Sequence, residues 1–372
     1  MALSFSSQDK GILPDRMISA LAAGGAIVPA RPFARDQIQP ASLDLRLGAV
    51  AYRVRASFLP GRTSVAHRIA DLKLHEFSLA DGAVLETGCV YIVPLLESLA
   101  LPKDVAAAAN PKSSTGRLDV FTRVIADQTR GFDRIEAGYR GPLYAEISPR
   151  TFPVLVREGS RLSQIRFRHG HAQLSADELR DLHARERLVD DAAADISEGV
   201  TFSVDLSGSL LSPTGADGVV GYRAKRHTGL IDVERRAGYT VLDFWEPITA
   251  RPDKSLILDP NEFYILASKE AVQVPPGYAA EMVPFDPLVG EFRVHYAGFF
   301  DPGFGYAGAG GTGSRAVLEV RSREVPFILE HGQVVGRLVY EKMLAKPDTL
   351  YGTGIGSNYQ AQSLKLSKHF KS

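Results

Sequence analysis

Residues 84–102 read "VLETGCVYIVPLLESLALP", and residues 257–275 read "ILDPNEFYILASKEAVQVP". A shift of 173 positions places the first stretch on the second, and the match continues downstream. A constant offset over about 75 residues indicates a duplicated domain. The matched pairs are Leu85 and Leu258, Tyr91 and Tyr264, Glu97 and Glu270, Pro102 and Pro275, Pro111 and Pro284, Glu146 and Glu319, and Gly159 and Gly332.

Short apolar segments between turn residues dominate both copies. Strand-length segments that either alternate between apolar and polar residues or are continuously apolar occur in residues 42–55 ("SLDLRLGAVAYRVR") and 90–102. The 34 glycines and 22 prolines suit a barrel or sandwich of short strands. We therefore predict a mainly β protein that contains two tandem distorted β-barrel domains, jelly-roll-like, with few short helices.

Two helices are expected. One covers about residues 14–23 and is ended by a pair of glycines. The other begins at Ser175, where Glu178 completes a capping box. The predicted organisation is a first domain over 1–174, a helical and charged connector over 175–199, and a second domain over 200–372.

The whole chain gives little sign of a polymeric or membrane partner. Its 372 residues suit two domains, and its 43 basic and 43 acidic residues cancel. A neutral protein has no general field for nucleic acid or an anionic membrane, so an anionic ligand needs a local site. One cysteine, Cys89, forms no intrachain disulfide, and we find neither a signal peptide nor an apolar run near ~20 residues. We expect a cytoplasmic protein.

Residues 112–117, "KSSTGR", gather groups that bind phosphate. The stretch lacks the Walker pattern, but its hydroxyls and backbone N–H groups are donors, and Lys112 and Arg117 supply positive charge. The alternative is a solvated basic turn. In the second copy Phe285 and Asp286 replace Lys112 and Ser113, which favours a function for the loop in the first copy, with ordinary drift as the alternative.

Glu146 lies in the apolar stretch "YRGPLYAEISP" (residues 139–149). A carboxylate there costs several kcal/mol unless it is paired or has a catalytic task. Desolvation suits a residue that both accepts and donates a proton. The alternative is a buried glutamate that only binds backbone groups.

The C-terminal region from residue 351 combines glycines with aromatic and amide side chains, including Tyr351, Tyr359, Gln360 and Gln362. Such a hinged tail is typical of a lid that closes on a ligand. The alternative is a frayed terminus.

Together these motifs resemble the dCTP deaminase branch of the dCTP deaminase/dUTPase superfamily. The resemblance rests on an N-terminal helix followed by "SLDLRLG" (42–48), on "LESLALP" (96–102) and on "KSSTGR", which stands where the family has RSSxxR. It continues through "EAGYRG" (136–141), "AEI" (145–147) and "REGSRLSQI" (157–165), and it ends in the tail. The second copy matches more weakly, through "FFDPGFG" (299–305), Glu319 and "LEHGQVVGRL" (329–338).

The resemblance implies dUTPase-like domains and a set of site residues. Glu146 corresponds to the family's catalytic glutamate, Glu136 to an aspartate of the acidic turn, and Gln164 to a substrate-contacting glutamine. Lys112 replaces the family's first arginine, and Asn358 replaces a tail lysine. The residues expected to bind substrate are Lys112, Ser113, Ser114, Arg117, Ala126, Glu136, Tyr144, Ala145, Gln164, Tyr351, Asn358 and Gln362.

The implied reaction is hydrolytic deamination of dCTP to dUTP and ammonia, in deoxynucleotide biosynthesis. Glu146 would take a proton from the water that attacks C4, Ser113 and Arg117 would lie beside that water, and backbone near Ala126 would read the base. Zinc deaminases need an H-x-E and P-C-x-x-C signature, which one cysteine cannot supply. We therefore expect no zinc and no protein-held metal, with Mg²⁺ arriving on the triphosphate. Single-domain relatives form trimers, so the chain is expected to form a homo-oligomer, a trimer of two-domain chains.

Other functions stay open at this point. "IEAGYRG" also resembles the turn of dUTPases, so a dUTPase, or a bifunctional enzyme that releases dUMP and pyrophosphate, is the alternative. A nucleotide-sensing or scaffold protein that lost turnover is the non-enzymatic alternative. We expect the first copy to hold the working site and the second copy to be mainly structural.

Overall fold

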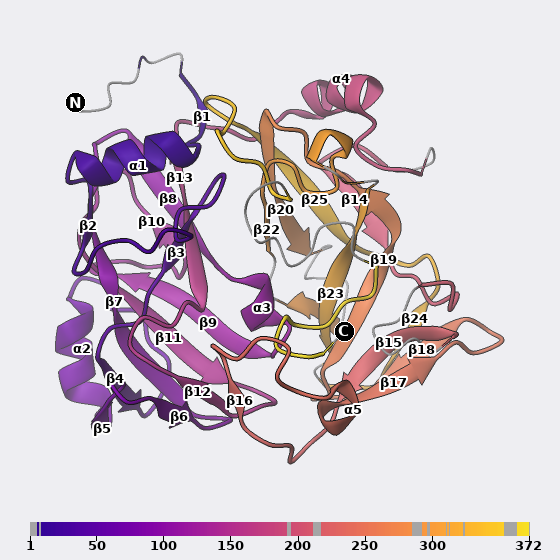
Figure 1. The fold of residues 1–372 in the computed structure, drawn as a ribbon, viewed down its shortest axis with the longest axis horizontal. Helices are drawn as coiled ribbons and strands as arrows, with labels where there is room; N and C mark the ends of the chain where they lie inside the picture. Colours follow the sequence, from indigo (N-terminus) through magenta and orange to yellow (C-terminus); the bar gives the residue numbers. More distant parts are fainter. Residues whose placement is uncertain are drawn as a thin grey trace. The chain divides into compact units, whose positions relative to one another are not determined.

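The chain forms two compact units in a computed structural model (Figure 1). The first unit comprises residues 1–172, 229–235 and 342–348, and the second comprises residues 173–228, 236–341 and 349–372. Two short segments from the second half of the sequence therefore belong to the first unit. The residues that the structure describes are 6, 9–191, 195–210, 217–284, 292–295, 298–309, 311, 313–322, 324–352 and 363–371.

The first unit consists mainly of strands. Its helices are α1 (Asp15–Ala23), α2 (Val65–Leu72) and α3 (Ser113–Gly116). Its strands are β1 (Gly11–Ile12), β2 (Ile27–Pro29), β3 (Leu43–Leu45), β4 (Val50–Val54), β5 (Lys73–Ser78), β6 (Ala83–Leu85), β7 (Val90–Ala100), β8 (Val105–Pro111), β9 (Val120–Ala126), β10 (Arg134–Ile135), β11 (Arg140–Pro149), β12 (Val154–Val156), β13 (Ser163–His169) and β16 (Ile231–Asp232).

These strands form three sheets. One has the order β1-β13-β8-β10, with β3 also paired to β13, and it is called here the loop sheet because β8 leads into α3. The next has the order β5-β4-β7-β11-β9, with β2 also paired to β7, and it is called the glutamate sheet because β11 carries Glu146. The third, β16-β12-β6, contains a parallel pair in which Val154 of β12 lies opposite Ile231 of β16.

Around β9 and β11 the glutamate sheet buries both of its faces. On one face Val124, Ala126 and Leu143 pack with residues of the loop sheet and with α1. On the other face Ile125 and Tyr144 pack with α2. Because side chains alternate along a strand, Arg123 and Glu146 share the α2 face with Ile125 and Tyr144.

The two segments contributed by the second half are held by charged contacts. Arg157 donates to both carboxylate oxygens of Asp232, at 2.8 and 2.9 Å. Arg16 pairs with Asp348 at 2.8 Å. These pairs fix residues 229–235 and 342–348 to the strands and helix of the first unit.

The second unit repeats the β-rich composition. Its helices are α4 (Ala176–Glu186), α5 (Val241–Phe244) and the 3₁₀ helix η1 (Ala307–Ala309). Its strands are β14 (Val200–Ser203), β15 (Val219–Ala224), β17 (Trp245–Thr249), β18 (Ser255–Leu258), β19 (Tyr264–Val272), β20 (Tyr278–Pro284), β21 (Phe292–His295), β22 (Phe299–Phe300), β23 (Ser314–Ser322), β24 (Phe327–Glu330) and β25 (Val334–Lys342).

The sheet order of the second unit is that of the first. The order β17-β15-β19-β23-β21 repeats β5-β4-β7-β11-β9, and β14-β25-β20-β22 repeats β3-β13-β8-β10. Fine details recur as well. The backbone N–H of Glu86 donates to the Tyr91 hydroxyl at 3.1 Å, and that of Asp259 donates to the Tyr264 hydroxyl at 2.9 Å. The structure thus confirms the duplication that the offset of 173 positions indicates.

A mainly β protein with few short helices is confirmed, and so are both expected helices. α1 ends before Gly24, and the Ser175–Glu178 capping box at the start of α4 has both of its hydrogen bonds. The helix α2 was not predicted. Its sequence, "VAHRIADL", is short, and its cap is Ser64, whose hydroxyl accepts the N–H of His67. No helix among the described residues is long and apolar enough to cross a membrane.

Candidate active site

The predicted phosphate loop follows β8 directly. Lys112 precedes α3, its backbone N–H donates to the Leu162 carbonyl at 2.9 Å, and Arg117 is the buried C-cap residue. The Lys112 ammonium forms an ion pair with Asp44, a buried carboxylate on β3. Arg161 lies 3.5 Å from the same carboxylate oxygen. The loop therefore lies beside a buried carboxylate, Asp44, that contacts both Lys112 and Arg161.

Gln164 joins this loop cluster, which comprises Asp44, Lys112, Arg117, Arg161 and Gln164. On β13 it lies in register with Asp44 on one side and with Asn110, just before the loop, on the other. Its amide donates to the Pro111 carbonyl at 3.4 Å. The structure thus brings together two elements that the sequence predicted separately, the basic loop and the glutamine.

The edge of the loop cluster carries a second ion pair. Arg161 donates to Asp36 at 2.9 Å, and this hydrogen bond holds the pKa of the Asp36 carboxyl below its ordinary value. The guanidinium therefore bridges an exposed acid and the buried Asp44. Neither Asp36, Asp44 nor Arg161 was singled out from the sequence, because their closeness depends on how β3 and β13 pair.

Glu146 lies near the middle of β11, with strands on both sides. Its register partners are Ile92 on β7 and Arg123 on β9, and the residue is 1% exposed. Carboxylate oxygen Oε1 accepts from Nε of Arg123 at 3.1 Å and from Nη2 at 2.5 Å. The other oxygen, Oε2, is buried and has no hydrogen-bond partner. The expectation of a buried carboxylate is met, and its partner is a side chain rather than backbone.

The other residues predicted near the base lie on the same pair of strands but on different faces. Ala126 is in register with Leu143 and packs toward the loop sheet. Tyr144 shares the α2 face with Glu146, and burial raises the pKa of its hydroxyl above the ordinary value. Ala145 is buried and, by alternation, points to the face opposite Tyr144. Any contact of Ala126 or Ala145 with a base would therefore be made through backbone atoms.

The remaining predicted residues belong to the acidic turn and to the tail. Glu136 is exposed in the turn between β10 and β11. Tyr351 belongs to the second unit, where its N–H donates to the Pro302 carbonyl at 2.8 Å and its ring lies 5.8 Å from Phe304. The predicted tail residues Asn358, Tyr359, Gln360 and Gln362 lie outside the described residues.

The second unit keeps a carboxylate at the position equivalent to Glu146. Glu319 on β23 is buried, and its register partners are Ile265 on β19 and His295 on β21. The segment that replaces the phosphate loop, including Phe285 and Asp286, lies outside the described residues. The expectation that this copy is mainly structural stays a prediction.

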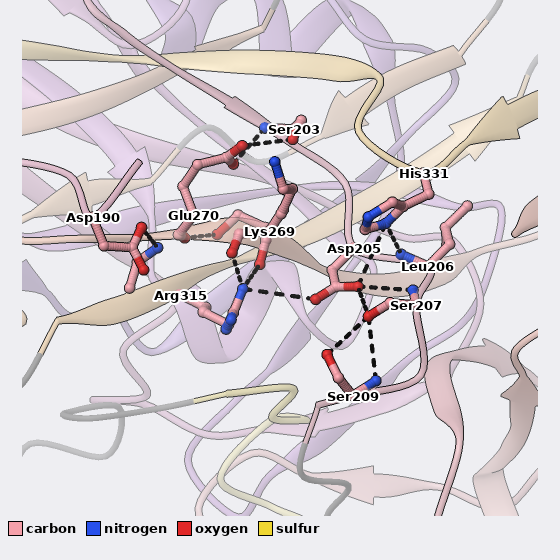
Figure 2. A network of polar contacts seen from close by, with 12 residues as sticks. Asp190, Ser203, Asp205, Leu206, Ser207, Ser209, Lys269, Glu270, Arg315 and His331 are labelled. Atoms are coloured by element: carbon pink, nitrogen blue, oxygen red, sulfur yellow. Dashed lines mark hydrogen bonds and ion pairs between the residues drawn. The ribbon is translucent and has the colours of Figure 1, made fainter. Parts of the chain in front are cut away.

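A polar network of the second unit contains Glu270, the repeat of Glu97 (Figure 2). Glu270 accepts from the backbone N–H of Ser203 at 2.7 Å and from its hydroxyl at 2.6 Å. Nearby, Asp205 accepts from Ser207 and lies 3.7 Å from Arg315 and 3.6 Å from His331. Glu270 is thus bound by one serine, whereas Asp205 has both a serine and two basic side chains beside it.

Within the described part of the chain, no group of three or more His, Cys, Asp or Glu side chains could hold a metal ion. The structure also identifies a further residue that was not singled out from the sequence, Arg123. Its signal is a cation inside the apolar stretch "VFTRVIA" (120–126), but its link to Glu146 requires the register of β9 and β11.

Comparison with known proteins defines the class. A family model of the 2′-deoxycytidine 5′-triphosphate deaminase N-terminal domain matches residues 9–171, and a model of the C-terminal domain matches residues 175–370. The chain belongs to the 2′-deoxycytidine 5′-triphosphate deaminase family, in a two-domain form.

Individual relatives agree with this assignment. The crystal structure of 2′-deoxycytidine 5′-triphosphate deaminase from Agrobacterium tumefaciens is 64% identical, with a TM-score of 0.88, over 94% of this chain and 100% of that chain. A "dCTP deaminase, dUMP-forming" of Methanoculleus marisnigri is 34% identical over 37% of this chain and 69% of the relative. A "dCTP deaminase" of Halorubrum lacusprofundi is 29% identical over 41% of this chain and 73% of the relative.

Proposed function

We propose that the protein hydrolytically deaminates dCTP and that Glu146 is the general acid and base of the reaction. The observation that carries the proposal is the state of this carboxylate. It is buried in the middle of a sheet, one oxygen is held by Arg123, and the other oxygen has no protein partner. A buried acceptor without a partner is costly, and a water or ligand is the usual explanation.

The proposed reaction uses the unpartnered oxygen of Glu146 as its proton acceptor. Glu146 takes a proton from water while the water oxygen bonds to C4 of the cytosine. The same carboxyl passes this proton to N3, takes the second proton from the hydroxyl now on C4, and passes it to the departing amine. The C4–N bond breaks as the C4 carbonyl forms, and ammonia leaves. The carboxylate ends the cycle ionised, so the chain needs no redox partner and no protein-held metal for these steps.

The loop cluster is proposed to bind the triphosphate. Lys112 and Arg117 carry the positive charge, and Ser113 and Ser114 supply hydroxyl donors. Because Lys112 is paired with Asp44, phosphate would compete with this carboxylate for the ammonium. Mg²⁺ would arrive bound to the triphosphate and would offset the charge of Asp44 and Asp36 near the phosphates.

An assembly of several copies is proposed to complete the site. The predicted residues fall into two groups, one on the loop sheet and one on the α2 face of the glutamate sheet, and Glu146 contacts Arg123 instead of a loop residue. A trimer of two-domain chains, as the resemblance implies, would let the loop of one copy meet the glutamate of another. The same proposal includes two further features. Each unit closes into a barrel, and the tail, from Tyr351 to Gln362, forms a lid.

The second candidate function concerns the product. Several curated relatives are named "dCTP deaminase, dUMP-forming", among them proteins of Methanoculleus marisnigri and Beutenbergia cavernae. These names favour the bifunctional reaction, in which pyrophosphate is also released, over simple formation of dUTP. A dUTPase that does not deaminate, and a nucleotide sensor without turnover, are the remaining outcomes.

Product analysis tests the proposal. The purified protein is incubated with dCTP and Mg²⁺, and nucleotides, ammonia and pyrophosphate are quantified. Ammonia with dUMP and pyrophosphate is the expected result, and ammonia with dUTP indicates deamination alone. No ammonia from dCTP, with dUMP formed from added dUTP, would overturn the proposed deamination. A parallel reaction with Glu146→Gln shows whether the activity depends on this site.

A further inference from the structure

Arg123 binds Glu146 through one oxygen only. Its Nε and Nη2 groups both donate to Oε1, at 3.1 and 2.5 Å. A guanidinium that bound the two carboxylate oxygens with one N–H each would engage both of them. In this geometry Oε2 has no hydrogen-bond partner. Arg123 therefore holds Oε1 of Glu146 and leaves Oε2 available to accept a hydrogen bond or a proton.

Arg123 is itself fixed from three sides. Its guanidinium carbon lies 4.6 Å from the centroid of the Phe121 ring and 3.4 Å from that of Phe132. Its Nη2 also donates to the Ser57 hydroxyl at 2.8 Å. Aromatic faces attract a guanidinium and limit its rotation, so the side chain has a defined position before any ligand binds.

We propose that Arg123 is the positioning residue of the reaction, and that it orients Glu146 so that only Oε2 faces water and the base. This inference rests on the proposed function of Glu146. Arg123 does not touch the reacting atoms. It holds Oε1, keeps the carboxylate plane fixed and compensates its charge inside the sheet.

The second unit lacks this pairing of residue types. The position equivalent to Arg123, in register with Glu319, is occupied by His295. A histidine has no fixed fork and is not permanently charged. The arrangement that we assign to Arg123 is therefore particular to the first unit.

Two substitutions of Arg123 separate charge from geometry. Arg123→Gln removes the charge, and Arg123→Lys keeps the charge but loses the planar fork. The matched control is Arg223→Gln in the second unit, because Arg223 binds Glu246 in the same way, through Nε at 3.2 Å and Nη2 at 2.6 Å on one oxygen. The readouts are kcat and KM for dCTP, with circular dichroism to verify folding.

For Arg123→Gln we expect kcat to fall about 10- to 100-fold, the scale of a misplaced catalytic group. We also expect its KM for dCTP to stay near the wild-type value, because Arg123 does not touch the substrate. Arg123→Lys should give an intermediate kcat with the same KM, and Arg223→Gln should match the wild type in both.

A wild-type kcat in Arg123→Gln would overturn the inference, as would a rise in KM with kcat unchanged. If Arg123→Gln does not fold, the kcat and KM of Arg123→Lys decide alone. Failure of the proposed function has a different signature, because it requires Glu146→Gln to remain active, whatever Arg123 does.

Discussion

The two units share their sheet order but differ in the partners of their buried carboxylates. In the first unit Glu97 binds the backbone N–H and the guanidinium of Arg46, at 2.8 and 2.7 Å. In the second unit Glu270 occupies the equivalent position and binds the backbone N–H and the hydroxyl of Ser203. The backbone contact is retained, and Ser203 stands in the second unit where Arg46 supplies the charged partner in the first.

The same contrast holds elsewhere in the first unit. Asp44 is paired with Lys112, and Glu146 is paired with Arg123. Backbone hydrogen bonds that define the fold recur in both units, whereas the residue types beside two of the carboxylates differ, with Ser203 in place of Arg46 and His295 in place of Arg123. The difference teaches that the duplication preserved the architecture of the sheets, while the polar chemistry around the carboxylates diverged.

The largest stability effect is expected at Glu97. Glu97→Gln leaves the buried Arg46 without a counterion and should lower the free energy of unfolding by about 3–5 kcal/mol. Glu270→Gln keeps one acceptor for Ser203 and should cost only about 1 kcal/mol. Denaturant unfolding of Glu97→Gln and Glu270→Gln measures the two losses in the free energy of unfolding. Equal losses would show that the charge of Arg46 contributes nothing particular to the first unit.

An intermediate effect is expected at alkaline pH, through Tyr139. Burial raises the pKa of its hydroxyl to about 12, and the hydroxyl donates to the Pro142 carbonyl at 2.7 Å. Its contribution to stability is fully present below the ordinary pKa of 10.0 and is lost as pH rises through about 12.

Phe304 stands at the equivalent place in the second unit, since Leu101 donates to the Tyr139 carbonyl and Val274 donates to the Phe304 carbonyl. Tyr139→Phe should therefore make the alkaline loss of stability less steep, measured by urea unfolding between pH 9 and 12. An unchanged slope would mean that Tyr139 does not titrate differently in the folded chain.

The smallest effect is expected where the units are most alike. Tyr91→Phe and Tyr264→Phe each remove one hydrogen bond to a backbone N–H, made in the first case by Glu86 and in the second by Asp259. Each should cost about 1 kcal/mol. Thermal unfolding of the two variants should give similar decreases, and a difference of several-fold would contradict the equivalence of these turns.

Much of the fold could be predicted from the sequence, because a duplication fixes many positions at once. The repeat that relates Tyr91 to Tyr264 can be read directly from the sequence, and so can the capping box of Ser175. Both correspond to hydrogen bonds in the structure. The membership of residues 229–235 in the first unit could not be predicted, because the parallel pairing of β16 with β12 has no local signal.

The residues of the candidate site could be predicted individually, but the ion pairs that they form could not. The basic loop and Glu146 are visible as unusual residues in their stretches. The partners Asp44 and Arg123 depend on the register of β3 with β13 and of β9 with β11, which composition does not fix. The separation of the loop cluster from Glu146 on different sheets likewise follows only from the three-dimensional structure.

The most direct test of the account is the kcat of Glu146→Gln beside that of Glu319→Gln, with dCTP and Mg²⁺ and with folding verified for both. The two variants make the same change at equivalent positions, on β11 and β23. The account predicts a loss of about 100-fold or more for Glu146→Gln, the scale of a lost general acid and base, and a nearly unchanged kcat for Glu319→Gln. A large loss in Glu319→Gln together with an active Glu146→Gln would place the chemistry in the second unit and contradict the account.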